Sequence, residues 1–259
     1  MGEDRSGQGP EVGLQHPVNV SDNSRDDAAA SRRLIFGRRR GRKLSPARET
    51  RMADWLPRLG FTLPAAGMTL DPARLFGAPK REYWVEVGFG DGGHMFALAE
   101  RHPDVGFIGV EPYEHGVAKL VMRVAEHVQQ GGADNIRILS DDARLLLKAL
   151  PAGSVARGFT LFPDPWPKKR HQWRRIVNAD TLHDWARLIP SGGLLRLATD
   201  VPDYQRWMLR HMLAEPGFEW LAAGSRDWLQ RPEDWPPSKY EQKAIAAGRT
   251  PHYYRLRRI

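Results

Sequence analysis

Short runs of β-branched and aromatic residues alternate with longer amphipathic stretches along the chain beyond residue 81. The runs predict strands at 83–87, 105–110, 135–139, 155–162 and 193–198, with two further candidates at 218–222 and 253–256. The stretches predict helices at 46–59, 92–101, 112–130, 143–150, 178–189 and 201–214. This alternation is typical of parallel strands joined by crossover helices. The predicted fold class is therefore α/β, with an open, mostly parallel central sheet flanked by helices.

A glycine-rich turn, Gly88–Gly93, follows the first predicted strand. Glycine permits positive φ and lets the backbone approach a ligand closely. In open α/β sheets, ligands bind beyond the carboxyl ends of the strands. Gly88, Gly90 and Gly93 match the G-x-G-x-x-G pattern of dinucleotide sites, whereas Gly88, Gly90 and Gly92 match the G-x-G-x-G pattern of S-adenosylmethionine enzymes. The glycines alone do not choose between the two cofactors.

Carboxylates stand beside three of the predicted strand ends. Glu111 ends the second strand, where it can accept hydrogen bonds from both hydroxyls of a ribose. Asp142 follows the third strand, where it can accept from an adenine amino group, and Glu86 could engage the methionine part of a cationic cofactor. A dinucleotide carries a pyrophosphate, which a carboxylate beside it would repel. The acids therefore favour S-adenosylmethionine.

The fourth predicted strand runs into a proline-rich loop, 162–171. Three prolines within five residues fix φ and remove backbone donors, so we expect a stiff loop that holds Asp164 and Trp166 at the mouth of the site. Five cations are expected at the same rim: Lys168, Lys169, Arg170, Arg174 and Arg175. Rings stack on bases and cations contact phosphates, so this composition favours a nucleic-acid substrate.

Composition and charge extend this picture to the amino-terminal part of the chain. Lysine and arginine outnumber aspartate and glutamate by 39 to 31, which gives a formal charge of +8. Seven of the twelve residues from 32 to 43 are cationic and none is acidic. We therefore predict a basic RNA-binding arm over 32–45 and a catalytic domain over 46–259. Residues 1–31 lack large apolar side chains and are predicted to be disordered.

Several function classes are excluded. The chain has no cysteine, and its nine histidines lack metal-ligand spacing, so no disulfide and no metal are expected. No apolar run approaches the ~20 residues that span a bilayer, and no secretory signal is visible. These features predict a cytoplasmic enzyme with no membrane contact.

The proline-rich loop, with Arg174 and Arg175 after it, resembles the characteristic motif of the bacterial tRNA (guanine-N7-)-methyltransferases. The resemblance extends from about Arg32 to the carboxyl terminus. Further matches are 86–90, 108–111, 198–200 with Tyr204, and 238–241. It implies a Rossmann-like class I S-adenosylmethionine-dependent methyltransferase fold. It also implies methyl transfer from S-adenosyl-L-methionine to N7 of a guanosine in the variable loop of tRNA.

The same resemblance implies roles for individual residues, with Asp164 as the catalytic one. The implied cofactor-binding residues are Glu86, Gly88, Gly90, Gly92, Glu111, Asp142 and Asp164. The implied substrate-binding residues are Lys168, Asp200, Ser238, Lys239, Tyr240 and Glu241. Ser238 stands where the family more often has threonine, and the hydroxyl is kept. The implied partner is tRNA, and the protein is either a monomer or a homodimer.

Three alternatives remain open from the sequence. A nicotinamide-dependent oxidoreductase would use the same glycine turn, but it needs a proton donor that we do not find. A non-catalytic RNA-binding subunit could retain the fold, although four acids argue against it: Glu86, Glu111, Asp142 and Asp164. The acceptor could also be another RNA or another base atom, because the residues indicate RNA and only the resemblance indicates guanine N7 of tRNA.

Overall fold

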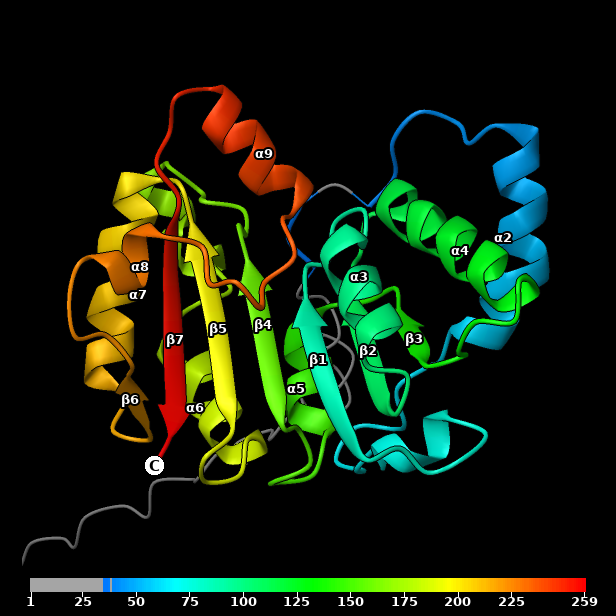
Figure 1. Ribbon diagram of the computed structural model, residues 1–259, viewed down its shortest axis with the longest axis horizontal. Helices are drawn as coiled ribbons and strands as arrows, with labels where there is room; N and C mark the ends of the chain where they lie inside the picture. Colours follow the sequence, from blue (N-terminus) through cyan, green and yellow to red (C-terminus); the bar gives the residue numbers. More distant parts are fainter. Residues whose placement is uncertain (1–34, 38) are drawn as a thin grey trace, which may run out of the picture. The chain divides into compact units, whose positions relative to one another are not determined.

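One sheet organises the protein, with the strand order β3-β2-β1-β4-β5-β7-β6 (Figure 1). We describe it from a computed structural model, which covers residues 35–37 and 39–259. The strands are β1 Glu82–Val87, β2 Val105–Val110, β3 Ile136–Leu139, β4 Arg157–Leu161, β5 Leu194–Thr199, β6 Phe218–Trp220 and β7 His252–Arg258. Strands β1 to β5 are parallel, and β7 runs antiparallel to both β5 and β6.

Helices cover both faces of this sheet (Figure 1). The α-helices are α2 Pro46–Leu59, α3 Gly93–Arg101, α4 Glu114–Gln129, α5 Ala143–Ala149, α6 Ala179–Leu188, α7 Pro202–Ala214, α8 Arg226–Leu229 and α9 Lys239–Ala246. Two 3₁₀-helices, η1 Pro72–Leu75 and η2 Lys169–Arg174, lie in connections. Helices α3 and α4 pack on one face, and α5, α6 and α7 pack on the other.

The alternation of side chains along each strand supplies two cores. In β1, Val85 and Val87 pack with α5 and α6, whereas the intervening Trp84 packs with α3 and α4. Successive strand residues point to opposite faces, so a parallel strand covered by helices on both sides needs apolar residues throughout. Strand β2, Val105–Val110, meets this requirement, because all six of its residues are buried.

The predicted α/β fold class is confirmed, and the predicted strands and helices are present with shifted ends. The helix expected from residue 112 begins at Glu114, with Tyr113 as its N-cap, so the proline precedes the helix. The strand expected to reach Phe162 ends at Leu161, because Phe162 has a positive φ of 51°. Helix α9 was not predicted, since few apolar positions mark it.

Strand β1 determines where a ligand can bind, because β2 lies on one side of it and β4 on the other. The chain moves outward in opposite directions from this point, which leaves a crevice at the carboxyl ends of β1 and β4. The predicted disordered segment 1–31 and the start of the predicted basic arm lie outside the described residues. Within the part of the chain that the structure describes, no helix is long and apolar enough to cross a membrane.

Candidate active site

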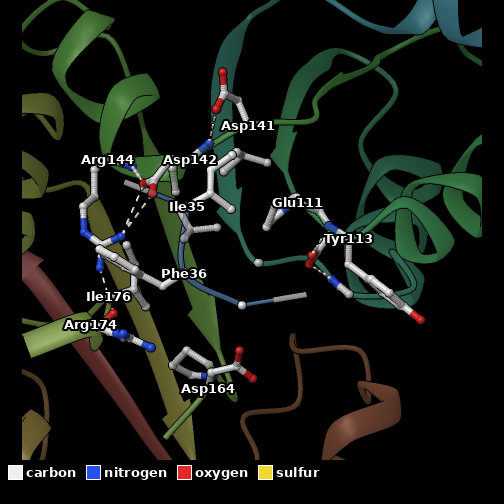
Figure 2. Close-up of a pocket in the computed structure, with 18 of the residues that line it drawn as sticks. Ile35, Phe36, Glu111, Tyr113, Asp141, Asp142, Arg144, Asp164, Arg174 and Ile176 are labelled. Carbon is white, nitrogen blue, oxygen red and sulfur yellow. Dashed lines mark hydrogen bonds and ion pairs between the residues drawn. The ribbon is translucent and has the colours of Figure 1, made fainter. Parts of the chain in front are cut away.

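A cavity of about 350 Å³ opens at this crevice (Figure 2). Its walls come from the turns after β1, β2, β3 and β4, with contributions from α9 and the amino-terminal segment. The lining residues are Ile35–Gly37, Val87, Gly88, Gly90, Val110–Tyr113, Asp141–Arg144, Phe162–Asp164, Trp166, Arg174, Ile176 and Tyr240. The volume lies within the range of about 300–1,000 Å³ that is usual for small-molecule sites.

The glycine turn forms one edge of the cavity. Gly88, Gly90 and Gly92 adopt positive φ values of 70°, 60° and 72°, whereas Gly93 is the first residue of α3. At Gly90 a side chain is excluded twice, because a Cβ atom would also lie 2.7 Å from Cε2 of Tyr240. The three left-handed positions coincide with the G-x-G-x-G spacing and not with the third glycine of the dinucleotide pattern.

Glu111 ties this turn to the start of α4. One carboxylate oxygen accepts the backbone N–H of Gly90 at 2.9 Å, and the other accepts that of Tyr113 at 2.9 Å. Burial raises the pKa of Glu111, and the two N–H donors oppose this shift. A carboxylate has about four acceptor positions, so the other lone pairs remain for a ligand with hydroxyl donors.

Asp141 and Asp142 form the wall beyond β3. Asp142 is the N-cap of α5 and accepts the backbone N–H of Arg144 at 2.9 Å, while the Arg144 guanidinium lies 3.3 Å from its other oxygen. Asp141 accepts the backbone N–H of Asp142 at 2.7 Å and also lines the cavity. The sequence prediction included Asp142 and missed Asp141, although the adjacent acid was the available signal.

The proline-rich loop holds Asp164 between two residues with unusual backbone geometry. Phe162 and Trp166 have φ values of 51° and 43°, and they are the non-glycine residues with positive φ in the described part of the chain. Such positions cost about 1–3 kcal/mol each and occur preferentially at functional sites. Both Asp164 and Trp166 line the cavity, and the stiffness of the loop stays a prediction.

The Asp164 carboxylate is available for a ligand. It accepts no hydrogen bond from the described residues, and Figure 2 shows it at the mouth of the cavity. Solvent still reaches the side chain, but the surrounding protein displaces enough water to raise the pKa of Asp164. An acid of this kind can accept a hydrogen bond or stabilise positive charge on a bound molecule.

Arg175 does not belong to the cationic rim, contrary to the sequence prediction. Its side chain is 1% exposed, and its guanidinium donates to the Pro165 carbonyl at 2.8 Å and to the Asp203 carboxylate. It also lies over the rings of Tyr204 and Trp207. A buried guanidinium needs acceptors, and here the acceptors connect the proline-rich loop to α7. Arg175 thus holds the proline-rich loop against α7.

Replacing Asp203 with asparagine is expected to reduce the free energy of unfolding by about 1–3 kcal/mol, because buried Arg175 loses a charged acceptor. The hydrogen bond from Arg175 holds the pKa of Asp203 below its usual range. A depressed carboxyl pKa supplies stability above the unfolded-state pKa, and this stability is lost as the pH falls through the folded-state pKa. Urea unfolding of both proteins at several pH values measures the difference, which should be largest near neutrality. A difference that stays constant into acid would contradict the assignment.

Glu86 is not among the residues that line the cavity. Its side chain is buried, and one carboxylate oxygen lies 2.7 Å from Nδ1 of His94, which is also buried. The described residues provide no partner for Nε2 of His94. The structure thus pairs Glu86 with a histidine that the sequence interpretation did not consider, and a contact between Glu86 and the cofactor stays a prediction.

The predicted substrate-binding residues separate into those that face the cavity or the surface and those that are engaged within the protein. Tyr240 lines the cavity and is half exposed, while Lys168 and Lys239 are exposed at the surface. Ser238 and Glu241 form the capping box of α9.

The second group is engaged within the protein. Buried Glu241 accepts from the Tyr253 hydroxyl at 2.5 Å, and Nε of Arg231 lies 3.0 Å from the same carboxylate oxygen. Asp200 pairs with Nε of Arg249 at 2.5 Å. Contacts of Asp200, Ser238 and Glu241 with a substrate therefore stay predictions.

Known proteins are similar to this chain over most of its length. Residues 80–253 match a family model described as "Putative methyltransferase". The tRNA (guanine-N(7)-)-methyltransferase of Rhodospirillum rubrum is 46% identical over 228 residues, which cover 86% of this chain and 87% of that protein. The enzyme of the same name from Paramagnetospirillum magneticum is 46% identical over 232 residues, 90% of this chain and 95% of that one.

A solved structure, that of the 16S rRNA methyltransferase KamB, superimposes with a TM-score of 0.51. It is 18% identical, with coverage of 70% of this chain and 88% of that one, and it supports the fold alone. The predicted methyltransferase fold is thereby confirmed. Because full-length relatives match at this level of identity, the chain belongs to the tRNA (guanine-N(7)-)-methyltransferase family.

Proposed function

We propose that this protein transfers a methyl group from S-adenosyl-L-methionine to N7 of a guanosine in the variable loop of tRNA. One observation carries the proposal beyond family membership. The Asp164 carboxylate, which none of the described residues engages, lines the same cavity as Glu111, and the exposed cations Lys168–Arg170 follow it closely along the chain. The proposed substrate places the reaction in the cytoplasm.

The residues of the cavity fit the methyl donor. Glu111 has acceptor positions left for the two ribose hydroxyls after binding two backbone N–H groups. Apolar side chains, among them Val110 and Ile176, offer walls for a flat adenine ring. Asp141 and Asp142 supply acceptors where an exocyclic amino group would point. The left-handed glycines carry no side chain, so the backbone of the turn can approach the donor closely.

Methyl transfer to guanine N7 requires little proton transfer by the protein. Guanine N7 carries an in-plane lone pair and no proton, so no base has to act before attack. The new N7–methyl bond forms as the sulfur–methyl bond breaks, and the sulfur keeps the electron pair. The guanine gains a positive charge while the sulfonium loses one. Positioning supplies much of the rate, and a carboxylate aimed at the developing charge stabilises the transition state more than the ground state.

Asp164 is the candidate for that carboxylate. It can lie beside the developing positive charge or accept hydrogen bonds from N1–H and N2–H of the guanine. The tRNA would contact the exposed cations of the loop, and Trp173, which is 59% exposed on η2, offers a ring for stacking. A guanine that is paired or stacked must leave its neighbours to reach the cavity, so we expect partial extrusion of the nucleotide.

The deciding experiment incubates the protein with labelled S-adenosylmethionine and unmodified tRNA, followed by borohydride reduction and aniline cleavage. This treatment cuts RNA at N7-methylguanosine. One cut in the variable loop would establish donor, substrate and target atom together. Label without a cut would retain a methyltransferase but refute the N7 assignment. No label, with an active control enzyme on the same tRNA, would favour the non-catalytic RNA-binding alternative.

Replacing Arg39 and Arg40 together with alanine is expected to weaken tRNA binding and to reduce the slope of log Kd against log salt concentration by about 1 for each cation. Both side chains are exposed, and the hydrogen bond that Arg39 makes through its carbonyl survives the substitution. Filter binding at several salt concentrations measures the slope. Arg101→Ala, at the far end of α3, is the control. An unchanged slope would remove these residues from the interface.

A further inference from the structure

The segment Ile35–Gly37 forms part of the cavity wall (Figure 2). The sequence analysis assigned this stretch to an RNA-binding arm, because cations surround it. Its own two side chains are apolar, however, and both are partly buried. Figure 2 shows Ile35 and Phe36 between Asp142 on one side and Asp164 on the other. They lie against the part of the cavity where the donor's adenine and ribose are proposed to bind.

Phe36 is held at this position by two guanidinium groups and a ring. The guanidinium groups of Arg144 and Arg174 lie over the face of the ring, with their Cζ atoms 5.1 and 5.5 Å from the ring centroid. Trp173 meets it edge-on at 4.7 Å between centroids. Arg144 also binds the Asp142 carboxylate and donates to the Arg174 carbonyl at 2.8 Å. The ring of Phe36 therefore packs on the same arginine that orients a predicted cofactor contact.

The described residues that follow are attached on the opposite side of the cavity. The Arg39 carbonyl accepts the backbone N–H of Glu114 at 2.9 Å, and the Arg42 carbonyl contacts Nε2 of His115. Gly41 lies so close to this helix end that a Cβ atom would be 2.5 Å from the Tyr113 hydroxyl oxygen. The arm is thus anchored near Asp142 at one end and at the start of α4 at the other, with Glu111 between the two anchors.

We infer that Ile35 and Phe36 bind the methyl donor as part of the cavity wall. The inference rests on the proposed function, because it assigns the occupant of that cavity. The segment is a wall and not a plug, because a cavity of about 350 Å³ remains beside it. The two cation–π contacts and the edge contact together hold the partly buried Phe36 ring in this position.

The test measures binding of S-adenosylhomocysteine to the full chain by calorimetry and stopped flow, without tRNA. Phe36→Ala should raise the dissociation constant about tenfold, since the loss of a half-buried aromatic contact is worth on the order of one factor of ten. Most of this change should appear as faster dissociation, because a contact that forms only in the complex is lost. Phe36→Leu, which keeps an apolar side chain but loses the ring face, should fall between the two proteins.

The matched control is Leu213→Ala, an apolar truncation on α7 at a position that is 69% exposed. It should bind S-adenosylhomocysteine as the wild type does. Unchanged binding by both Phe36 variants would overturn the inference, and tighter binding would do so as well, because it would make the arm a plug. If the wild type itself bound no S-adenosylhomocysteine, the proposed function would fail instead. Thermal unfolding without ligand shows whether the Phe36→Ala protein is folded, and Phe36→Leu decides the matter if it is not.

Discussion

Replacing Asp164 with asparagine is expected to lower the rate of methyl transfer at saturating donor and tRNA by about 10²–10³-fold. The dissociation constants of S-adenosylhomocysteine and of tRNA should change little. The reason is that the carboxylate acts on charge that develops only as the methyl group moves, so its removal affects the transition state more than either bound state. Single-turnover kinetics with labelled donor separates this step from binding and release.

The pH dependence of the same step offers a second measurement. The surrounding protein displaces water from Asp164 and raises its pKa, so activity should fall with decreasing pH through a value above the pKa of a free aspartate. Burial also raises the pKa of Glu111. The decrease in wild-type activity at low pH therefore does not by itself show which of the two carboxylates is being protonated. The Asp164→Asn protein should lose the part of this decrease in activity that comes from protonation of Asp164.

The control for this variant is Glu233→Gln, which removes one exposed carboxylate in the connection between α8 and α9. It should leave both the rate and the pH profile unchanged. If Asp164→Asn instead abolished tRNA affinity while the bound fraction turned over normally, Asp164 would be a substrate-binding residue and not the catalytic one.

Replacing Glu111 with glutamine is expected to raise the dissociation constant of S-adenosylhomocysteine by about 10²-fold. Both carboxylate oxygens accept backbone N–H groups, one from Gly90 and one from Tyr113. An amide has a single oxygen, so its NH₂ group must face one of these donors and the turn loses a bond. The ribose hydroxyls also lose a charged acceptor. Hydrogen bonds to charged groups contribute about 1.5–3 kcal/mol each, which corresponds to a factor of this size.

Titration calorimetry measures this change, with Glu126→Gln on the exposed surface of α4 as the control. Affinity for tRNA should be largely retained, because Glu111 lies inside the cavity and not at the cationic rim. Normal donor affinity together with weakened tRNA binding would show that the cavity belongs to the RNA and not to the methyl donor.

Local signals in the sequence were sufficient for the fold class and for several residues that line the cavity. Strand β2 is a continuous apolar run because helices cover both faces of the sheet, and that requirement is visible in the residues themselves. The left-handed turn at Gly88, Gly90 and Gly92 is visible for a similar reason, since glycine is the residue that tolerates this backbone. The prolines around Asp164 likewise restrict their own torsions. In each case the physical cause lies within a few residues of its effect.

The tertiary structure decided which charged groups face inward. Nothing near Arg175 in the chain shows that it leaves the cationic rim, because its partner Asp203 lies in α7. Glu86 also turns inward, and its partner His94, although only eight residues away, is brought to it by the packing of α3 on the sheet. Ser238 and Glu241 fit a capping box that could be recognised locally, but the burial of Glu241 depends on Tyr253.

The amino-terminal arm shows the largest difference between the sequence prediction and the tertiary structure. Its cations suggested RNA in the sequence, and they remain exposed at 39, 40, 42 and 43. The apolar pair Ile35 and Phe36 joins the cavity only because residues more than a hundred positions away, Arg144 and Arg174, meet around the ring. A pattern along the chain reports periodicity and composition, whereas contacts between distant segments depend on how the sheet brings its strand ends together.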